Sequence, residues 1–311
     1  MIQGIDISRH QGDVDFNKVV VEGKMQFCFC KLTEGGDYQD PKVSAYWAQM
    51  LDQGSLLRGL YHFARPDLRP GRSGGETEGR NFARAAKSLG HYSSGCLPPM
   101  LDFEKYSDSD DKDNIPWIQG WLDVVESELG RDAGIYTGAN IWKYEVGNTD
   151  DFSSRTLWQV DYTQTRQEPK PIADGKWDWS FWQWSGGGDF AYYGPVPGVN
   201  GDCDVNRFNG SESQLDELAL FGKARPEPTF EGGIMPLVDI RSANEDLVKR
   251  VQGLLMSHGI GPDGLAGKDG LPDGIAGPIT VESLAAFNRA IGHVDEASLL
   301  HPSTWYGLLL D

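Results

Sequence analysis

Strand-like and helix-like segments alternate through the first 221 residues of this 311-residue chain, and this alternation restricts its fold more than any other feature. Apolar runs of strand length fall at residues 2–7, 27–32, 59–63, 99–103, 133–136, 156–162, 180–184 and 203–208. Helical periodicity lies between the early runs, at residues 43–53, 76–89 and 115–129. Such alternation predicts a parallel α/β sheet covered by helices, and eight strands suggest a barrel. Turn residues dominate after Tyr136, so we expect the last third of the barrel to be less regular.

Four carboxylates stand at the ends of these apolar runs: Asp6 in IQGIDI, Asp102 and Glu104 in LPPMLDFE, and Asp204 in CDVNRF. Asp102 and Glu104 are two residues apart, so they project to the same face of a strand and can share one cavity. Their closeness raises the proton affinity of one of them, which keeps a carboxylic acid protonated near neutral pH. Carboxylates gathered where loops meet a rigid sheet are typical of enzymes that cleave glycosidic bonds.

Composition excludes several classes of protein. Hydrophobic residues make up 39% of the chain, but no run of 18 apolar residues predicts a membrane span. The net charge of −18 argues against nucleic acid as a partner, because phosphate binding needs a basic surface. The first residues, MIQGIDISRHQG, lack a basic segment followed by an apolar one. We therefore expect synthesis in the cytoplasm of the producing cell without a signal peptide, and action on any extracellular target after release.

The four cysteines, Cys28, Cys30, Cys96 and Cys203, show no metal-ligand spacing. Two of them alternate with phenylalanines in FCFCK, as small apolar residues do in a buried strand. The sequence therefore predicts reduced core thiols. It predicts no metal centre in the barrel and no cofactor.

Residues 222–236 read as a semi-rigid linker, and residues 237–311 as a small all-α domain. Two amphipathic helices are expected there, at 242–257 and 278–291, with the tail at 305–310 closing the core. Ser242 and Glu245 fit a capping box, which would start the first helix. The inward residues are Leu247, Val248, Val251, Leu254 and Leu255 in the first helix and Val281, Leu284, Phe287 and Ile291 in the second.

The segment between those helices, residues 261–278, repeats Asp-Gly turns and has two interpretations. Asp263, Asp269 and Asp273 would be the ligands of a calcium loop. The spacing lacks the D-x-D-x-D-G pattern and the bidentate Glu of a hand-type site, and Asp-Gly is a common turn dipeptide. The sequence favours a series of turns in this segment, and calcium binding remains an open alternative.

Six motifs occur in the order found in glycoside hydrolase family 25: GIDISRHQG, KLTEG, YHFARP, LDFE, FWQWSG and DVNRF. The match spans about residues 1–210. The chain thus resembles lysozymes of the N-acetylmuramidase type, many of them bacteriophage endolysins. The resemblance implies an incomplete TIM-like barrel of five β/α units followed by three strands. It also implies bacterial peptidoglycan as the substrate, hydrolysed between N-acetylmuramic acid and N-acetylglucosamine.

The carboxylates receive different roles. Glu104 ends an apolar strand and pairs with Asp102, so it is expected to be the general acid, and Asp102, on the same face, is expected to orient the acetamido group of the substrate. Asp6 and Asp204 would be ordinary strand-end residues without the resemblance, which places them in the site. One departure is Asp161 in LWQVDY, at a position where the family has a small or basic residue.

Several aromatic residues are candidates for sugar contacts, because aromatic faces stack on sugar rings. We expect Tyr61, Tyr136, Trp158 and Trp184 to bind substrate, although an aromatic in a barrel is more often core. His62 is expected to be a hydrogen-bonded core residue.

The C-terminal part resembles small helical peptidoglycan-binding domains through DGIAGPIT followed by LAAFN. It departs from them by an extra glycine-rich segment at 261–272. Two non-enzymatic alternatives are a wall-binding protein with an inactive barrel and a virion anchoring protein, and the intact carboxylates favour the enzyme. The sequence leaves the oligomeric state open.

Overall fold

The computed structural model describes residues 2–90, 94–106, 111–219, 238–243, 245–257, 265–267, 271–290 and 299–300. The chain divides into two compact units. The described parts of residues 1–43 and 55–228 belong to the larger unit, and those of 44–54 and 229–311 to the smaller one. The expected linker at 222–236 lies outside the described residues, so the boundaries at 221 and 237 stay predictions.

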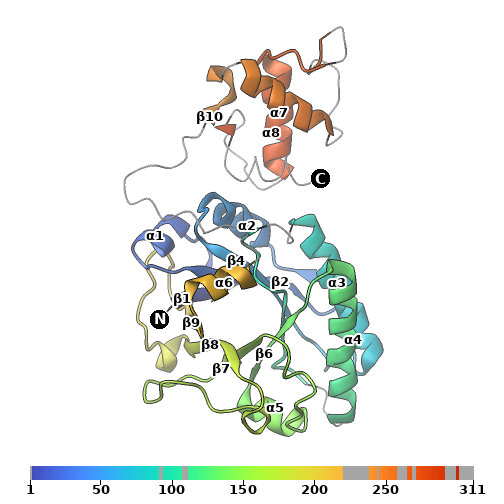
Figure 1. The fold of residues 1–311 in the computed structure, drawn as a ribbon, viewed down its shortest axis with the longest axis vertical. Coiled ribbons are helices and arrows are strands. Elements are labelled where there is room, and N and C mark those ends of the chain that lie inside the picture. Colours follow the sequence, from blue (N-terminus) through green and yellow to red (C-terminus); the bar gives the residue numbers. More distant parts are fainter. Residues whose placement is uncertain are drawn as a thin grey trace. The chain divides into compact units, whose positions relative to one another are not determined.

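The described part of residues 2–219, α2 included, forms a barrel built from alternating strands and helices (Figure 1). The elements are β1 (Ile2–Ile7), α1 (Phe16–Val21), β2 (Phe27–Glu34), β3 (Tyr38–Gln39), α2 (Val43–Asp52), β4 (Leu57–Phe63), α3 (Arg72–Ser88), β5 (Met100–Asp102), α4 (Asp111–Leu129), β6 (Gly134–Gly138), α5 (Ala139–Glu145), β7 (Leu157–Val160), β8 (Trp179–Ser185), β9 (Asp204–Phe208) and α6 (Glu212–Leu218). Strands β1, β2 and β4 to β8 run parallel, and β9 closes the ring antiparallel between β8 and β1. Five β/α units followed by three strands confirm the expected fold class.

Large aromatic side chains fill the barrel. Phe29 stacks on Trp158 with ring centroids 4.6 Å apart, and Phe181 meets both Phe27 and Phe29 edge to face. Gly59 makes room for this layer, since a Cβ there would lie 2.2 Å from the Phe29 ring. A filled interior leaves only the ends of the strands open for a site. The four cysteines are buried and unbridged, which confirms the expectation of reduced core thiols.

Helices α3 and α4 pack side by side on the outside of the barrel (Figure 1). Helix α3 begins at Arg72, four residues before the expected start, in the glycine-rich stretch RSGGETEG. Gly75 explains the difference, because a Cβ there would lie 2.0 Å from the carbonyl oxygen of Trp117 on α4. The glycines that resemble a loop in the sequence allow the two helices to approach closely.

The smaller unit has its own apolar core around α7 (Glu245–Ser257) and α8 (Pro278–Ala290). The most deeply buried residues are Ile240, Val248, Val251, Leu255, Leu265 and Leu284. The unit is not purely helical, because β10 (Val238–Asp239) pairs with β11 (Leu299–Leu300). Ile291 and the expected closing tail at 305–310 lie outside the described residues. No helix among the described residues is long and apolar enough to cross a membrane.

Two expectations about turns in this unit have different outcomes. The capping box was wrong: Ser242 belongs to a short 3-10 turn, and its hydroxyl donates to the carbonyl of Asp239 at 2.9 Å. Asp273 accepts from the Gln252 amide at 2.7 Å and from the backbone N–H of Ile275 at 2.8 Å, as a turn residue does. Asp263 and Asp269 lie outside the described residues, and the described ones contain no cluster suited to a metal ion.

Candidate active site

Strand pairing brings the predicted carboxylates to one end of the barrel. Asp6, near the end of β1, is the register partner of Asp204, which begins the antiparallel β9. Asp102 ends β5, and Glu104 follows it by two residues. The parallel strands β1 and β5 point the same way, so their last residues meet at the same rim. All four expected catalytic residues therefore lie in one acidic cluster.

Asp6 is held by a chain of hydrogen bonds. Its Oδ2 accepts from the side-chain amides of Gln183 at 2.9 Å and Asn206 at 2.8 Å. Asn206 in turn accepts from the indole N–H of Trp158 at 2.7 Å. An indole nitrogen can only donate, so the Asn206 amide must present its NH₂ to Asp6. This arrangement favours the ionised form of Asp6.

Gln183 is oriented from the other side by two phenol groups. The hydroxyls of Tyr136 and Tyr162 donate to its Oε1 at 2.9 and 2.8 Å. Burial raises the pKa of Asp6 to about 6, and the two amide donors oppose that rise. Asp6 is therefore ionised at neutral pH.

The opposite side of the cluster has a different environment. Asp102 is 7% exposed, and its Oδ1 accepts no hydrogen bond from the described residues. Burial, followed by repulsion from Glu104, raises the pKa of Asp102 well above its usual range. Burial also raises the pKa of Glu104, against the opposing charges of Lys105 and Lys31. The Asp102–Glu104 pair therefore retains a proton more readily than free carboxylates do.

Asp204 adds to the field of the cluster. Burial and repulsion from Asp6, Glu104 and Asp202 raise the pKa of Asp204 to about 8. Gly186 lies against it, and a Cβ on that glycine would come within 3.1 Å of the Asp204 carboxylate. Four closely coupled acids cannot all be ionised together, so this rim can both supply a proton and stabilise a developing positive charge.

The aromatic residues expected to bind sugar lie mostly beneath this surface. Trp158 is 2% exposed and packs in the barrel core, where it reaches the site only through Asn206. Tyr61 is also largely buried, as is Tyr136, whose hydroxyl supports Gln183. Trp184 lies under the guanidinium of Arg207, 3.8 Å from the ring centroid. Direct stacking on a sugar does not fit the buried Trp158 ring, which positions Asn206 instead.

Sequence reasoning missed three residues of the site: Gln183, Asn206 and Tyr162. A signal existed for two of them. Asn206 is two residues after Asp204 on β9, which places both on one face, and Gln183 lies within FWQWSG. Tyr162 gave no such signal, because it follows β7 by two residues and carries no motif of its own.

Asp161 itself is directed into its own loop. Its carboxylate pairs with Arg166 and accepts the backbone N–H of Lys170 at 2.8 Å. His62 is fully buried between Thr33 Oγ1 at 2.8 Å and Glu78 Oε2 at 2.9 Å. This confirms the expectation of a hydrogen-bonded core histidine.

A closed β/α barrel with several acids gathered at the strand ends is an arrangement typical of glycoside hydrolases. Residues 5–192 match the model of glycosyl hydrolases family 25, and the chain belongs to this family. Lysozyme M1 of Streptomyces globisporus is 32% identical over 225 residues, which are 70% of this chain and 71% of that protein.

Solved structures agree with this assignment. The bacterial lysozyme of Streptomyces coelicolor matches with a TM-score of 0.61 and 29% identity, covering 70% of this chain and 96% of that one. A family GH25 lysozyme of Aspergillus fumigatus matches with a TM-score of 0.58 and 30% identity, covering 70% and 98%.

Proposed function

We propose that the chain is a lysozyme that hydrolyses the β-1,4 bond from N-acetylmuramic acid to N-acetylglucosamine in bacterial peptidoglycan. The observation that carries the proposal is the pair of acids, Asp102 and Glu104, two residues apart where β5 ends at the rim of a filled barrel. The similarity to lysozymes from a bacterium and a fungus supports the substrate class.

Glu104 is the general acid of this proposal. It follows the end of β5 and is only half-buried, so a substrate oxygen can reach it while burial still raises its pKa. Its proton passes to the glycosidic oxygen as the bond to the sugar carbon breaks. The resulting carboxylate then takes a proton from the water that completes hydrolysis.

Asp102 acts on the substrate rather than on the leaving group. The 2-acetamido N–H of the muramic acid ring donates to the carboxylate of Asp102, which stands at the end of β5 two residues before Glu104. Held in this way, the acetamido oxygen attacks the anomeric carbon and forms a ring that water later opens. Substrate assistance of this kind is a known exception to the scheme with a carboxylate nucleophile.

Asp6 and Asp204 supply the negative field of the site. Asp6, ionised and fixed by two amides, stabilises the positive charge that develops on the sugar ring. Asp204 faces it across the β1–β9 pairing and shares this role.

Mass spectrometry of digested peptidoglycan tests the assignment. New reducing ends on N-acetylmuramic acid are the expected product. Cleavage of amide bonds, or new reducing ends on N-acetylglucosamine, would overturn it.

The smaller unit is a wall-targeting module in this proposal. Its separate core around α7 and α8 supports an independent role, and the resemblance of residues 273–280 to peptidoglycan-binding domains supports the ligand. Residues 236–311 carry ten acidic and five basic side chains, so recognition relies on hydrogen bonds rather than on attraction to anionic polymers. Binding of the full chain to purified sacculi at high salt tests this role.

An endolysin role completes the proposal: the protein accumulates in the cytoplasm of its host and reaches the wall after release. Cell fractionation before and after lysis tests it. Protein found outside intact cells would contradict it.

A further inference from the structure

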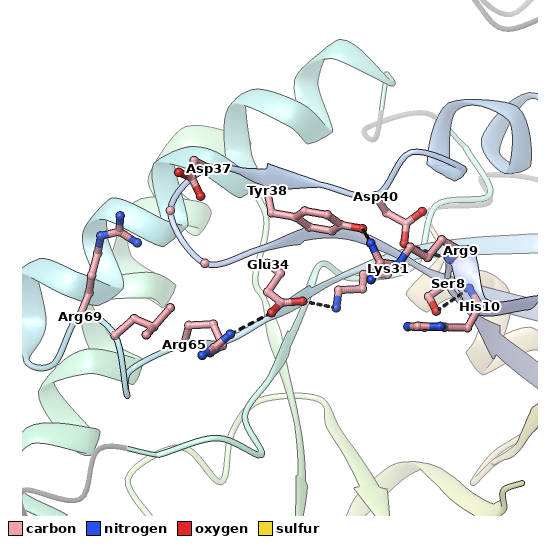
Figure 2. A pocket seen from close by; sticks show the side chains of 13 residues that line it. Ser8, Arg9, His10, Lys31, Glu34, Asp37, Tyr38, Asp40, Arg65 and Arg69 are labelled. Atoms are coloured by element: carbon pink, nitrogen blue, oxygen red, sulfur yellow. Dashed lines mark hydrogen bonds and ion pairs between the residues drawn. The ribbon is translucent and has the colours of Figure 1, made fainter.

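A cavity of about 310 Å³ opens at the same rim of the barrel as the acidic cluster, and Figure 2 shows the side chains that line it. Its walls come from the ends of β1, β2 and β4 and from the turn between β2 and β3. None of the four carboxylates of the cluster lines it. The roles proposed for the cluster therefore leave this cavity unassigned.

Strand register places the cavity close to the scissile bond. Glu34 on β2 pairs with Phe63 on β4, and Phe63 pairs with Asp102 on β5. Glu34 is thus two strands away from Asp102, a distance of roughly 10 Å at the usual strand spacing. Lys31, on the same strand as Glu34, opposes the rise in the pKa of both Asp102 and Glu104, which fits this proximity. A substituent on a bound sugar ring could span such a gap.

Positive charge concentrates in this cavity although the chain as a whole carries −18. Four cations line it, namely Arg9, Lys31, Arg65 and Arg69, together with His10. Lysine and arginine are outnumbered 28 to 46 in the chain, so four of them around one cavity form a local reversal of charge.

Two of the three acidic residues of the cavity are already engaged. Glu34 binds Lys31 at 2.6 Å and Arg65 at 3.1 Å, as the dashed lines in Figure 2 show. Asp40 is buried and accepts the backbone N–H groups of Arg9 and Lys42 at 3.0 and 2.9 Å. The third, Asp37, is exposed on the turn between β2 and β3.

The guanidinium groups of Arg69 and Arg9 have N–H donors that remain available to a ligand. Arg69 makes no side-chain hydrogen bond or ion pair with the described residues, and its Nη1 lies over Gly36, where a Cβ would come within 2.8 Å. Arg9 gives one N–H to the hydroxyl of Tyr38 at 3.1 Å. Each guanidinium has five N–H donors in a planar fork, which matches a carboxylate.

We propose that this cavity binds a carboxylate of the peptide stem carried by the muramic acid, with Arg69 and Arg9 as its main contacts. The proposal rests on the peptidoglycan activity proposed above and extends it to the substituents of the glycan. Lys31 and Arg65 are paired with Glu34, and Arg65 also with Asp67, so the positive charge offered to a ligand comes mainly from Arg9 and Arg69. Tyr38 and His10 are the two ring-bearing side chains that line the cavity among the described residues, and neither Trp nor Phe lines it, so charge rather than ring stacking dominates recognition.

Two glycan fragments of equal length test the proposal, one with free stem carboxylates and one with the same carboxylates amidated. The wild-type enzyme should show a kcat/KM about 3- to 10-fold higher on the free-acid fragment, as expected for partly exposed charge-assisted contacts. The difference should lie in KM, and it should fade near 1 M salt, where the screening length falls to about 3 Å.

Substitution then assigns the effect to the cavity. Arg69→Gln should lower kcat/KM on the free-acid fragment far more than on the amidated one and so remove most of the preference, while Arg69→Lys should keep part of it. Arg80→Gln is the matched control, because Arg80 is an exposed arginine of α3 that pairs with Glu76 outside the cavity.

The outcomes separate this proposal from the one on which it rests. Equal rates of the wild-type enzyme on both fragments would overturn the carboxylate site and leave the muramidase assignment standing. Failure to cleave either fragment would overturn the muramidase assignment, and the carboxylate site with it. Equal rates combined with inhibition by glycerol phosphate that Arg69→Gln abolishes would assign the cavity to phosphate instead.

Discussion

The carboxylates on the two sides of the acidic cluster differ in how many hydrogen bonds the protein donates to them. On the side of β1, β8 and β9, Asp6 accepts two amide hydrogen bonds, and each amide is held by further donors. On the side of β5, Asp102 has a buried oxygen with no donor among the described residues. The protein thus holds Asp6 in its ionised form by its own hydrogen bonds, whereas Asp102 gains its hydrogen bond from the acetamido group when the substrate binds.

Of the changes considered, loss of the general acid Glu104 should have the largest effect on activity. Glu104→Gln should lower kcat on peptidoglycan by about 10²- to 10⁴-fold, because the amide cannot protonate the leaving oxygen. Substrate binding and thermal unfolding should stay nearly unchanged. Glu22→Gln, at an exposed helix end, is the matched control. A Glu104→Gln enzyme that clears cell walls at the wild-type rate would remove Glu104 from the mechanism.

Stability should distinguish the two sides directly. Asp6→Ala leaves the amides of Gln183 and Asn206 without their acceptor and should lower the free energy of unfolding by about 2–4 kcal/mol. Asp102→Ala leaves no hydrogen-bond donor without its acceptor, so it should lower the free energy of unfolding by less at pH 7. Thermal unfolding followed by tryptophan fluorescence measures both variants. Equal losses of unfolding free energy in the two variants would contradict the difference in hydrogen bonding between Asp6 and Asp102.

Asp204 gives a pH-dependent version of the same test. Its pKa is about 8 in the folded protein and 3.8 in the unfolded chain, so the folded state binds this proton more tightly. The stabilisation from that proton is present below about pH 4 and is lost as the pH rises through 8. Asp204→Asn should therefore become more stable relative to the wild type as the pH rises, by up to about 5 kcal/mol at pH 8. A gain that does not depend on pH would show that ionisation is not the cause.

Removal of the smaller unit should have the smallest effect. A chain ending at Gly233 should cleave soluble wall fragments at the full rate, because the acidic cluster lies wholly in the barrel. It should act several-fold more slowly on intact walls, where a second contact raises the local concentration. Unchanged activity on intact walls, with unchanged binding to sacculi, would reject the targeting role.

The sequence predicted the barrel well because its strands are apolar and its helices amphipathic. The eight expected strands appear, and so do the expected barrel helices at α2, α3 and α4. The short helices α1, α5 and α6 gave no periodic signal of their own, since each has only six or seven residues.

The site was predictable in part. The carboxylates could be found because each stands at a strand end, a place that sequence patterns reveal. The network around Asp6 could not, because Gln183 and Tyr162 reach it from β8 and the end of β7, and only the closure of the barrel brings them together. The burial of Trp158 was missed for the same reason.

The stereochemistry of hydrolysis tests most directly whether the acetamido group of the substrate, oriented by Asp102, attacks the anomeric carbon. Proton NMR of the freshly released muramic acid end should show retained β configuration, and intact-protein mass spectrometry during turnover should show no sugar attached to the enzyme. Inversion of the anomeric centre, or a sugar bonded to Asp102, would contradict the account.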